Sequence, residues 1–226
     1  MIIGNGLVAR AFKSYFDKDL DFIVFASGVS NSKETSPNEF NRERSLLLDA
    51  IAKDKFLLYF STCSLYDAEL QNSPYVQHKK DMEVLVSGSK KYMIFRLPQL
   101  IGKTENKNTL SNYIYSHIVN GIKFSIWKRA QRNIIDIEDV ASIVNYLMRH
   151  TGIHNSVVNV ACSFSISITS LVSTFEQVTG ISANYDLINS GAAYPIDTTL
   201  VSEVLPKLGI NFDDDYIEKI VRKYYF

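Results

Sequence analysis

The chain opens with a glycine-rich turn directly after a very short apolar segment. Met1-Ile2-Ile3 has the character of a strand, and Gly4-Asn5-Gly6-Leu7-Val8-Ala9 has the spacing G-x-G-x-x-A ahead of a helical pattern that begins at Arg10. Such a turn places backbone N–H groups at the start of a helix, where they can face a pyrophosphate. The pattern therefore predicts a dinucleotide-binding turn and a cofactor.

The segment after this turn is too short for a complete dinucleotide site. Such a site has a second strand, with an acidic residue about 20 positions after the turn. Here the next apolar strand, Phe22 to Ala26, starts directly after Asp17 to Asp21, which leaves room for one helix and no second strand. We expect that a strand-helix-strand segment is missing, that the first strand lies near a sheet edge, and that the adenosine half of the site is incomplete.

Composition restricts the class of partner. A chain of 226 residues with 46% hydrophobic residues suits one domain, or one domain with a small lobe. Its 24 basic and 24 acidic side chains cancel, which disfavours nucleic acid and anionic membrane surfaces as partners and favours a small molecule.

Neither a metal site nor a membrane segment is expected. Cys63 and Cys162 lie far apart, and the four histidines show no metal-ligand spacing, so we expect no metal and no disulfide. The uncharged run from Thr151 to Phe175 is too rich in Ser, Thr and Asn to span a bilayer, and the N-terminus shows no leader pattern. The expected compartment is the cytoplasm.

Apolar runs typical of strands alternate with helical patterns along the chain. The strand-like runs are Phe22 to Ala26, Phe56 to Phe60, Tyr92 to Leu97 and Val157 to Val160. The helical patterns between them cover Asn38 to Lys53, Pro74 to Val86 and Glu138 to Arg149. This alternation predicts a parallel α/β fold. A further helical pattern at Leu110 to Val119, and two more near the C-terminus, predict a small lobe that faces the substrate.

Tyr75 and Lys79 form a candidate pair for proton transfer. Ser73 and Pro74 make a favourable helix start, because Ser can cap exposed N–H groups and Pro suits the first helical position. Tyr75 and Lys79 then share one helix face, where the lysine ammonium can stabilise the phenolate. A tyrosine and a lysine at this spacing are expected by chance in a chain this rich in both residues, so the spacing alone is weak evidence. The position of the pair, after the strand Phe56 to Phe60 and a polar turn, is what supports a functional role.

Six short motifs follow one another in a characteristic order. They are the turn from Gly4 to Ala9, the strand end Phe22 to Gly28, the segment Phe60 to Tyr66, the Y-x-x-x-K-x-x-x-E helix from Tyr75 to Glu83, the R-L-P-x-x-x-G turn from Phe95 to Gly102, and the segment Arg132 to Ala141, similar to R-x-x-I-x-V-x-D-V-A. This order resembles the extended short-chain dehydrogenase/reductase family, in its branch of nucleotide-sugar epimerases, dehydratases and keto-reductases.

The resemblance implies a fold. It is an α/β, Rossmann-like parallel sheet with helices on both faces, reduced by the missing strand-helix-strand segment, with a small C-terminal substrate lobe. Residues 1–102 would form the NAD(P)-binding core. Residues 103–226 would supply the remaining core strands and helices together with the lobe.

The resemblance also implies a role for each matched residue. Thr62 would hydrogen-bond the substrate carbonyl or alcohol, Tyr75 would exchange the proton, and Lys79 would hold the tyrosine and the nicotinamide ribose. Residues expected to contact the cofactor are Gly4, Asn5, Gly6, Leu7, Val8, Ala9, Ala26, Ser27, Gly28, Ser61, Tyr75, Lys79 and Pro98. Those expected to contact the substrate are Thr62, Cys63, Ser64, Gln99 and Arg132, with Arg132 on the diphosphate of a nucleotide-sugar.

Several of these residues also have a purely structural interpretation. Thr62 can cap a turn, and Arg132 can be a solvated surface charge. Glu83 is expected to form an ion pair within its helix, and Asp139 to cap a helix. Trp127 is expected to pack in the core or in the lobe.

Departures from the family pattern narrow the expected activity. Related dehydratases carry an acidic pair after the catalytic threonine, where this chain has Cys63 and Ser64, and this disfavours a 4,6-dehydratase. An epimerase must hold its NAD tightly through many turnovers. An incomplete adenosine site is better suited to a cofactor that is released and replaced at each turnover. We therefore predict an NAD(P)-dependent keto-reductase for a nucleotide-linked sugar, with NADPH slightly preferred. A nucleotide-sugar epimerase of the same family, or a binding or scaffold protein that retains the fold, is the alternative.

Apolar residues on the helix that carries Tyr75 could form either a dimer interface or part of the core. Members of the family commonly dimerise through this helix, and Met82, Val84, Leu85 and Val86 permit a homodimer. The same residues permit burial in the core equally well.

Overall fold

Five strands form a parallel sheet at the centre of the protein, in the order β1-β2-β3-β4-β9. The computed structural model describes all residues, 1–226. The strands are β1 (Ile2–Ile3), β2 (Phe22–Phe25), β3 (Phe56–Thr62), β4 (Tyr92–Leu97) and β9 (Ser156–Asn159). This sheet confirms the predicted Rossmann-like α/β class, and each strand overlaps a run expected from the sequence.

Strand β1 lies at the edge of the sheet, as predicted. It pairs only with β2, with Ile2 opposite Val24 and Ile3 opposite Phe25. Helix α1 (Leu7–Phe16) crosses directly from β1 to its neighbour β2. The strand-helix-strand segment missing from the sequence is thus missing from the sheet, and no strand continues the sheet beyond β1.

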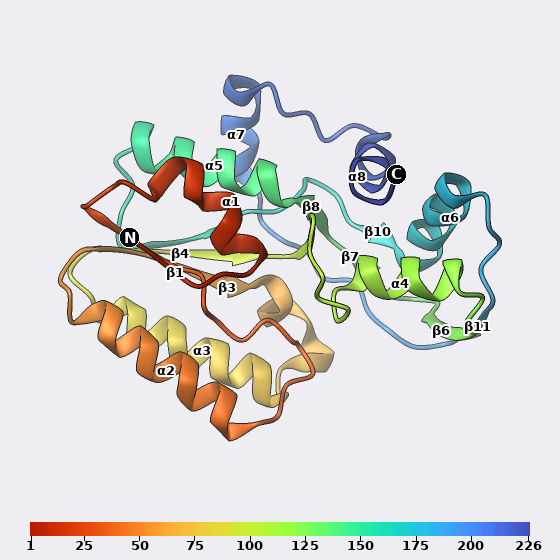
Figure 1. Cartoon of the computed structure of the whole chain (residues 1–226), viewed down its shortest axis with the longest axis horizontal. Helices are drawn as coiled ribbons and strands as arrows, with labels where there is room; N and C mark the ends of the chain where they lie inside the picture. Colours follow the sequence, from red (N-terminus) through yellow and green to blue (C-terminus); the bar gives the residue numbers. More distant parts are fainter.

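Helices cover both faces of the sheet (Figure 1). Helix α1 lies on one face with α5 (Ile137–His150) and α7 (Thr199–Leu208), and α2 (Pro37–Ile51) and α3 (Pro74–Ser87) lie on the other. Strand residues alternate between two apolar clusters: Val24 and Leu58 pack toward α1 and α5, whereas Ile23 and Leu57 pack toward α2 and α3. Since both faces are covered, β2 and the first five residues of β3, Phe56 to Phe60, are a continuous apolar run rather than alternating.

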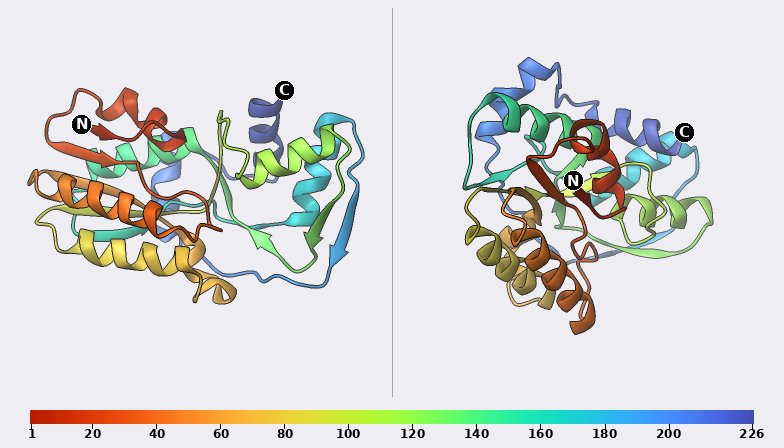
Figure 2. Two further views of the ribbon diagram at one scale, coloured as in Figure 1. Left: turned by 60° about the horizontal axis from the view of Figure 1, so that its bottom comes forward. Right: turned by 60° about the vertical axis from the view of Figure 1, so that its left-hand side comes forward.

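The second half of the chain also builds a lobe with its own apolar core. Its elements are β5 (Gln99–Ile101), α4 (Leu110–Val119), β6 (Phe124–Trp127), β7 (Gln131–Arg132), β8 (Ile134–Asp136), β10 (Ile166–Ser167), α6 (Ile168–Thr179), β11 (Tyr185–Ile188) and α8 (Tyr216–Tyr225). β5 pairs with β8 and β6 with β11 in parallel, and β7 pairs with β10 antiparallel. Figure 2 shows this lobe on the side of the sheet where β4 ends.

Polar contacts attach helix α8 to the start of α5. Asp136 is the N-cap of α5, because its carboxylate accepts the N–H of Glu138 at 2.8 Å. The expectation that Asp139 caps this helix is therefore wrong. Asp139 lies in the first turn and accepts a hydrogen bond from the Tyr216 hydroxyl at 2.7 Å. Lys223 of α8 lies 2.8 Å from Asp136 and completes the junction.

One other packing expectation also needs correction. Glu83 forms its ion pair with Arg96 of β4, at 2.6 Å, and not with a residue of its own helix. Trp127 lies on β6 of the lobe, one of its two expected places, but at 44% exposed it is only partly packed there. On α3, Met82 and Val86 are buried in the core and Val84 is exposed. None of the helices is long and apolar enough to cross a bilayer.

Candidate functional site

A cavity of about 480 Å³ lies where β1, β2, β3 and β4 end. Its wall consists of the glycine-rich turn, the segment after β2, the end of β3 with the start of α3, and the residues that follow β4 and β5. Ligands of parallel α/β sheets bind at the carboxyl ends of the strands. No acidic side chain lines the cavity, whereas the cationic residues Arg42 and Lys79 do.

The glycine-rich turn has the geometry of an anion-binding loop. Gly4 has a φ of +124°, and a β-carbon there would lie 2.4 Å from the carbonyl oxygen of Ala26, so only glycine fits. A β-carbon on Gly6 would instead have no atom within 4 Å. No side chain caps the start of α1, so its first N–H groups are free for a ligand.

Thr62 and Tyr75 both line this cavity. Thr62 Oγ1 accepts the N–H of Ser64 at 3.1 Å, so it caps the short helix η1 (Cys63–Tyr66) and still has its own hydrogen to donate. Tyr75 starts α3 behind Pro74 and the N-cap Ser73, as expected from the sequence. Thr62 can therefore cap the turn and face the cavity at the same time.

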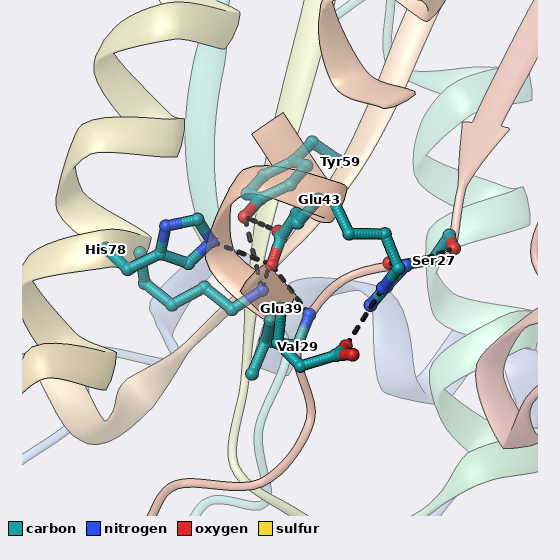
Figure 3. A network of polar contacts seen from close by, with 8 residues as sticks. Ser27, Val29, Glu39, Glu43, Tyr59 and His78 are labelled. Carbon is teal, nitrogen blue, oxygen red and sulfur yellow. Dashed lines mark hydrogen bonds and ion pairs between the residues drawn. The ribbon is translucent and has the colours of Figure 1, made fainter. Parts of the chain in front are cut away.

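Lys79 lines the same cavity but does not bond to Tyr75. Its ammonium donates to Glu43 Oε1 at 3.0 Å and to the Tyr59 hydroxyl at 3.2 Å. Figure 3 shows Glu43 and Tyr59 within this network of polar contacts. Neither Glu43 nor Tyr59 could be identified as a site residue from the sequence.

Nearly all residues expected to contact the cofactor line the cavity. The exception is Ala9, which is fully buried in α1. Ser61 contributes a buried hydroxyl without a hydrogen-bond partner in the protein, and a ligand can satisfy it. These features fit a dinucleotide, because an open glycine turn, free N–H groups, an unpaired hydroxyl and two cations face one cavity.

The residues expected to contact the substrate divide into two groups. Thr62, Ser64 and Gln99 line the cavity, whereas Cys63 and Arg132 do not. Cys63 is buried, and burial raises the pKa of its thiol to about 12. It therefore stays protonated at neutral pH and cannot act as a general acid there.

Arg132 on β7 lies at the boundary between the sheet and the lobe. Its guanidinium is 3.9 Å from the buried carboxylate of Asp67 and donates to the carbonyl oxygen of Gln131 at 2.7 Å. With its side chain only 17% exposed, Arg132 is not a solvated surface charge. Burial raises the pKa of the Tyr194 phenol, although the charge of Arg132 lowers it.

Several other residues of the cavity were not identified from the sequence. They are Val29, Ser30 and Ser32 after β2, Arg42 on α2, and Thr104, Asn106, Asn108 and Thr109 ahead of α4. Arg42 Nη1 donates to the carbonyl oxygen of Ser27 at 3.0 Å. Its helical position among other charged residues gave no indication that it faces a site.

The fold and the cavity together define a protein of the dinucleotide-binding, Rossmann-like class. A sequence model of the NAD dependent epimerase/dehydratase family matches residues 4–161, and the chain belongs to this family. A comparison with curated proteins finds no match.

Several solved structures share the fold. The UDP-N-acetylglucosamine 4-epimerase of Methanobrevibacter ruminantium, in complex with UDP-N-acetylmuramic acid, is 19% identical with a TM-score of 0.68, over 91% of this chain and 76% of that one. A double mutant of the dTDP-glucose 4,6-dehydratase DesIV from Streptomyces venezuelae, with NAD and DAU bound, is 14% identical with a TM-score of 0.72, over 96% and 76%. RMD from Pseudomonas aeruginosa, complexed with NADPH, is 16% identical with a TM-score of 0.69, over 98% and 95%.

Proposed function

We propose that this protein is an NAD(P)-dependent keto-reductase that acts on a nucleotide-linked sugar through Thr62, Tyr75 and Lys79. The observation that carries the proposal is that all three side chains share one cavity with the open glycine turn. The family and the ligands named for RMD and DesIV support a nicotinamide cofactor. When bound, that cofactor supplies the hydride.

The residues of the chain have distinct tasks in this proposal. The turn at Gly4 and Gly6, with the first N–H groups of α1, holds the pyrophosphate. Thr62 donates its free hydrogen to the substrate carbonyl oxygen, and Tyr75 delivers the proton to the same oxygen as it becomes an alcohol. An ammonium has three N–H donors, and Glu43 and Tyr59 occupy two of those of Lys79. The third is left for the nicotinamide ribose.

We further propose that NADPH is preferred over NADH. Sites that select NAD place an acidic side chain on the ribose hydroxyl, and no acidic side chain lines this cavity. Arg42, on the side of the cavity near Ser27, adds a positive charge that favours an additional phosphate. The missing strands leave the free edge of β1 uncovered, which suits a cofactor that is released and replaced at each turnover.

The nucleotide-sugar is proposed to bind between this cavity and the lobe. Gln99 and Ser64 lie on the cavity wall, and the loop before α4 covers the side that faces the lobe. Arg132 is held beside Asp67 and would need to release that carboxylate to reach a diphosphate. A homodimer through α3 remains a proposal that rests on the exposed Val84.

A turnover assay tests the proposal. Nucleotide-free protein is mixed with NADPH and a panel of nucleotide-linked keto-sugars, and the loss of NADPH absorbance is followed. Stoichiometric NADPH consumption is the expected result. Interconversion of sugar epimers without net NADPH consumption would replace the reductase with an epimerase. Cofactor binding without conversion of any nucleotide-sugar would contradict both.

A further inference from the structure

We infer that Glu43 is a positioning residue of the cofactor site, which holds the Lys79 ammonium and the segment 27–29 in place against the cavity. The inference rests on the proposed function. It adds Glu43 of α2 to Tyr75 and Lys79 of α3 as residues that form the site. It predicts that Glu43 affects the affinity for the nicotinamide cofactor through Lys79 and not only through the stability of the fold.

Glu43 occupies a core position. It lies on the same face of α2 as Leu47 and Ala50, and its exposed fraction is 0%. A buried carboxylate is costly unless charges and hydrogen bonds compensate it, and a Leu at this position would pack against the sheet at no such cost. The carboxylate therefore needs a reason beyond packing.

Four donors from three separate segments converge on this carboxylate (Figure 3). Oε1 accepts from the Tyr59 hydroxyl at 2.7 Å and from Lys79 Nζ at 3.0 Å. Oε2 accepts from the N–H of Val29 at 2.6 Å and lies 2.9 Å from His78 Nε2. The lone pairs of both oxygens are thus occupied, which fixes the side chain in one orientation.

This polar cluster lies directly behind the cavity wall. Gly28, Val29 and Lys79 line the cavity. A β-carbon on Gly28 would lie 2.7 Å from Lys79 Nζ and 3.0 Å from Glu43 Oε1, so the ion pair packs against the backbone of this segment. A shift of Glu43 would move the lysine and the wall together.

Glu43 also determines what Lys79 can offer a ligand. Two of the three N–H donors of the ammonium point to Glu43 and Tyr59, so the remaining donor has a fixed direction. No hydrogen bond joins Lys79 to Tyr75, so the position of the ammonium comes from α2 and β3 and not from the tyrosine. A flexible lysine side chain would otherwise lose rotamer freedom when a cofactor binds.

A double-mutant cycle with NADPH as the probe tests the inference. The variants are E43Q, K79M and the double variant E43Q/K79M, and NADPH affinity is measured by calorimetric titration, with thermal unfolding recorded for each. E43D keeps the charge but retracts the oxygens by one methylene, and it replaces E43Q if that variant fails to fold. D49N, an exposed acid-to-amide change on the same helix, is the matched control.

We expect E43Q to weaken NADPH binding about tenfold, E43D several-fold and D49N not at all. The double variant should bind NADPH no more weakly than K79M, because Glu43 acts through Lys79. Binding by folded E43Q or E43D equal to that of the wild type, or losses that simply add in the double variant, would overturn the inference and leave the proposed function intact. Failure of the wild type to bind NADPH or NADH would overturn both.

Discussion

The backbone at Gly4 packs against the carbonyl oxygen of Ala26, so closely that a β-carbon on Gly4 would lie 2.4 Å from that oxygen. This contact joins the glycine turn after β1 to the end of β2, the strand that follows it in both sequence and sheet. The turn is therefore held in place even though β1 has no neighbour on its other side.

Gly4 and Gly6 should respond differently to substitution by alanine. G4A places a β-carbon against backbone at a positive φ, so we expect a loss of about 2 kcal/mol or more in the free energy of unfolding. G6A meets open space at an ordinary φ and should change stability by only a few tenths of a kcal/mol, yet obstruct the pyrophosphate. Urea unfolding and NADPH titration check both, and NADPH binding by G6A equal to the wild type would exclude the turn from the site.

Y75F should abolish turnover while NADPH affinity stays within a few-fold of the wild type. The phenol hydroxyl is the proposed proton donor, whereas the ring of Tyr75 remains to shape the cavity wall. Y113F, which removes the hydroxyl of an exposed tyrosine on α4, serves as the control. Substantial residual activity in Y75F would remove Tyr75 from the mechanism.

R42Q should weaken NADPH binding more than NADH binding. The guanidinium of Arg42 lines the cavity beside Ser27, and an additional phosphate would gain more from its charge than a ribose hydroxyl would. We expect a loss of roughly tenfold for NADPH at low salt. R44Q, on the exposed side of the same helix, controls for net charge. Equal losses for the two cofactors would show that Arg42 does not select between them.

Glu43 should make the wild type sensitive to acid. Burial on its own raises the pKa of this carboxyl, but the charge of Lys79 and the hydrogen bonds from His78, Val29 and Tyr59 outweigh it and lower the pKa from 4.5 to about 2. Because the folded pKa is the lower one, the stabilisation is complete above about pH 4.5 and is lost as the pH falls toward 2.

The size of this effect can be measured. The shift corresponds to about 3 kcal/mol at most. The free energy of unfolding of the wild type should therefore fall more steeply than that of E43Q across this pH window. If the free energy of unfolding fell equally with pH in the wild type and in E43Q, the result would contradict a paired, ionised Glu43.

The sheet could be predicted from the sequence because its strands are buried on both faces. Segments such as Phe56 to Phe60 are continuous apolar runs, and the helices between them begin at clear caps such as Ser73. Helix α6 was missed, because Ile168–Thr179 is rich in Ser, Thr and β-branched residues with weak helix propensity. Packing in the lobe, together with caps at Ser167 and Gly180, stabilises it as a helix.

The Glu43 cluster could not be predicted from local sequence. Glu43 stands among Glu39, Arg42 and Arg44, a pattern typical of a solvated helix face. Its spacing from Leu47 and Ala50 marks the apolar face of α2 and was the one available indication of burial. The donors that compensate its charge come from distant segments, so their convergence is a property of the tertiary structure alone.

Calorimetric titration of the nucleotide-stripped protein with NADPH, and then with NADH, measures whether the cavity at the ends of β1 to β4 binds a nicotinamide cofactor despite the missing strands. We expect micromolar binding, tighter for NADPH. No detectable binding of either cofactor at millimolar concentration would contradict this expectation and would favour a binding or scaffold protein that retains only the fold.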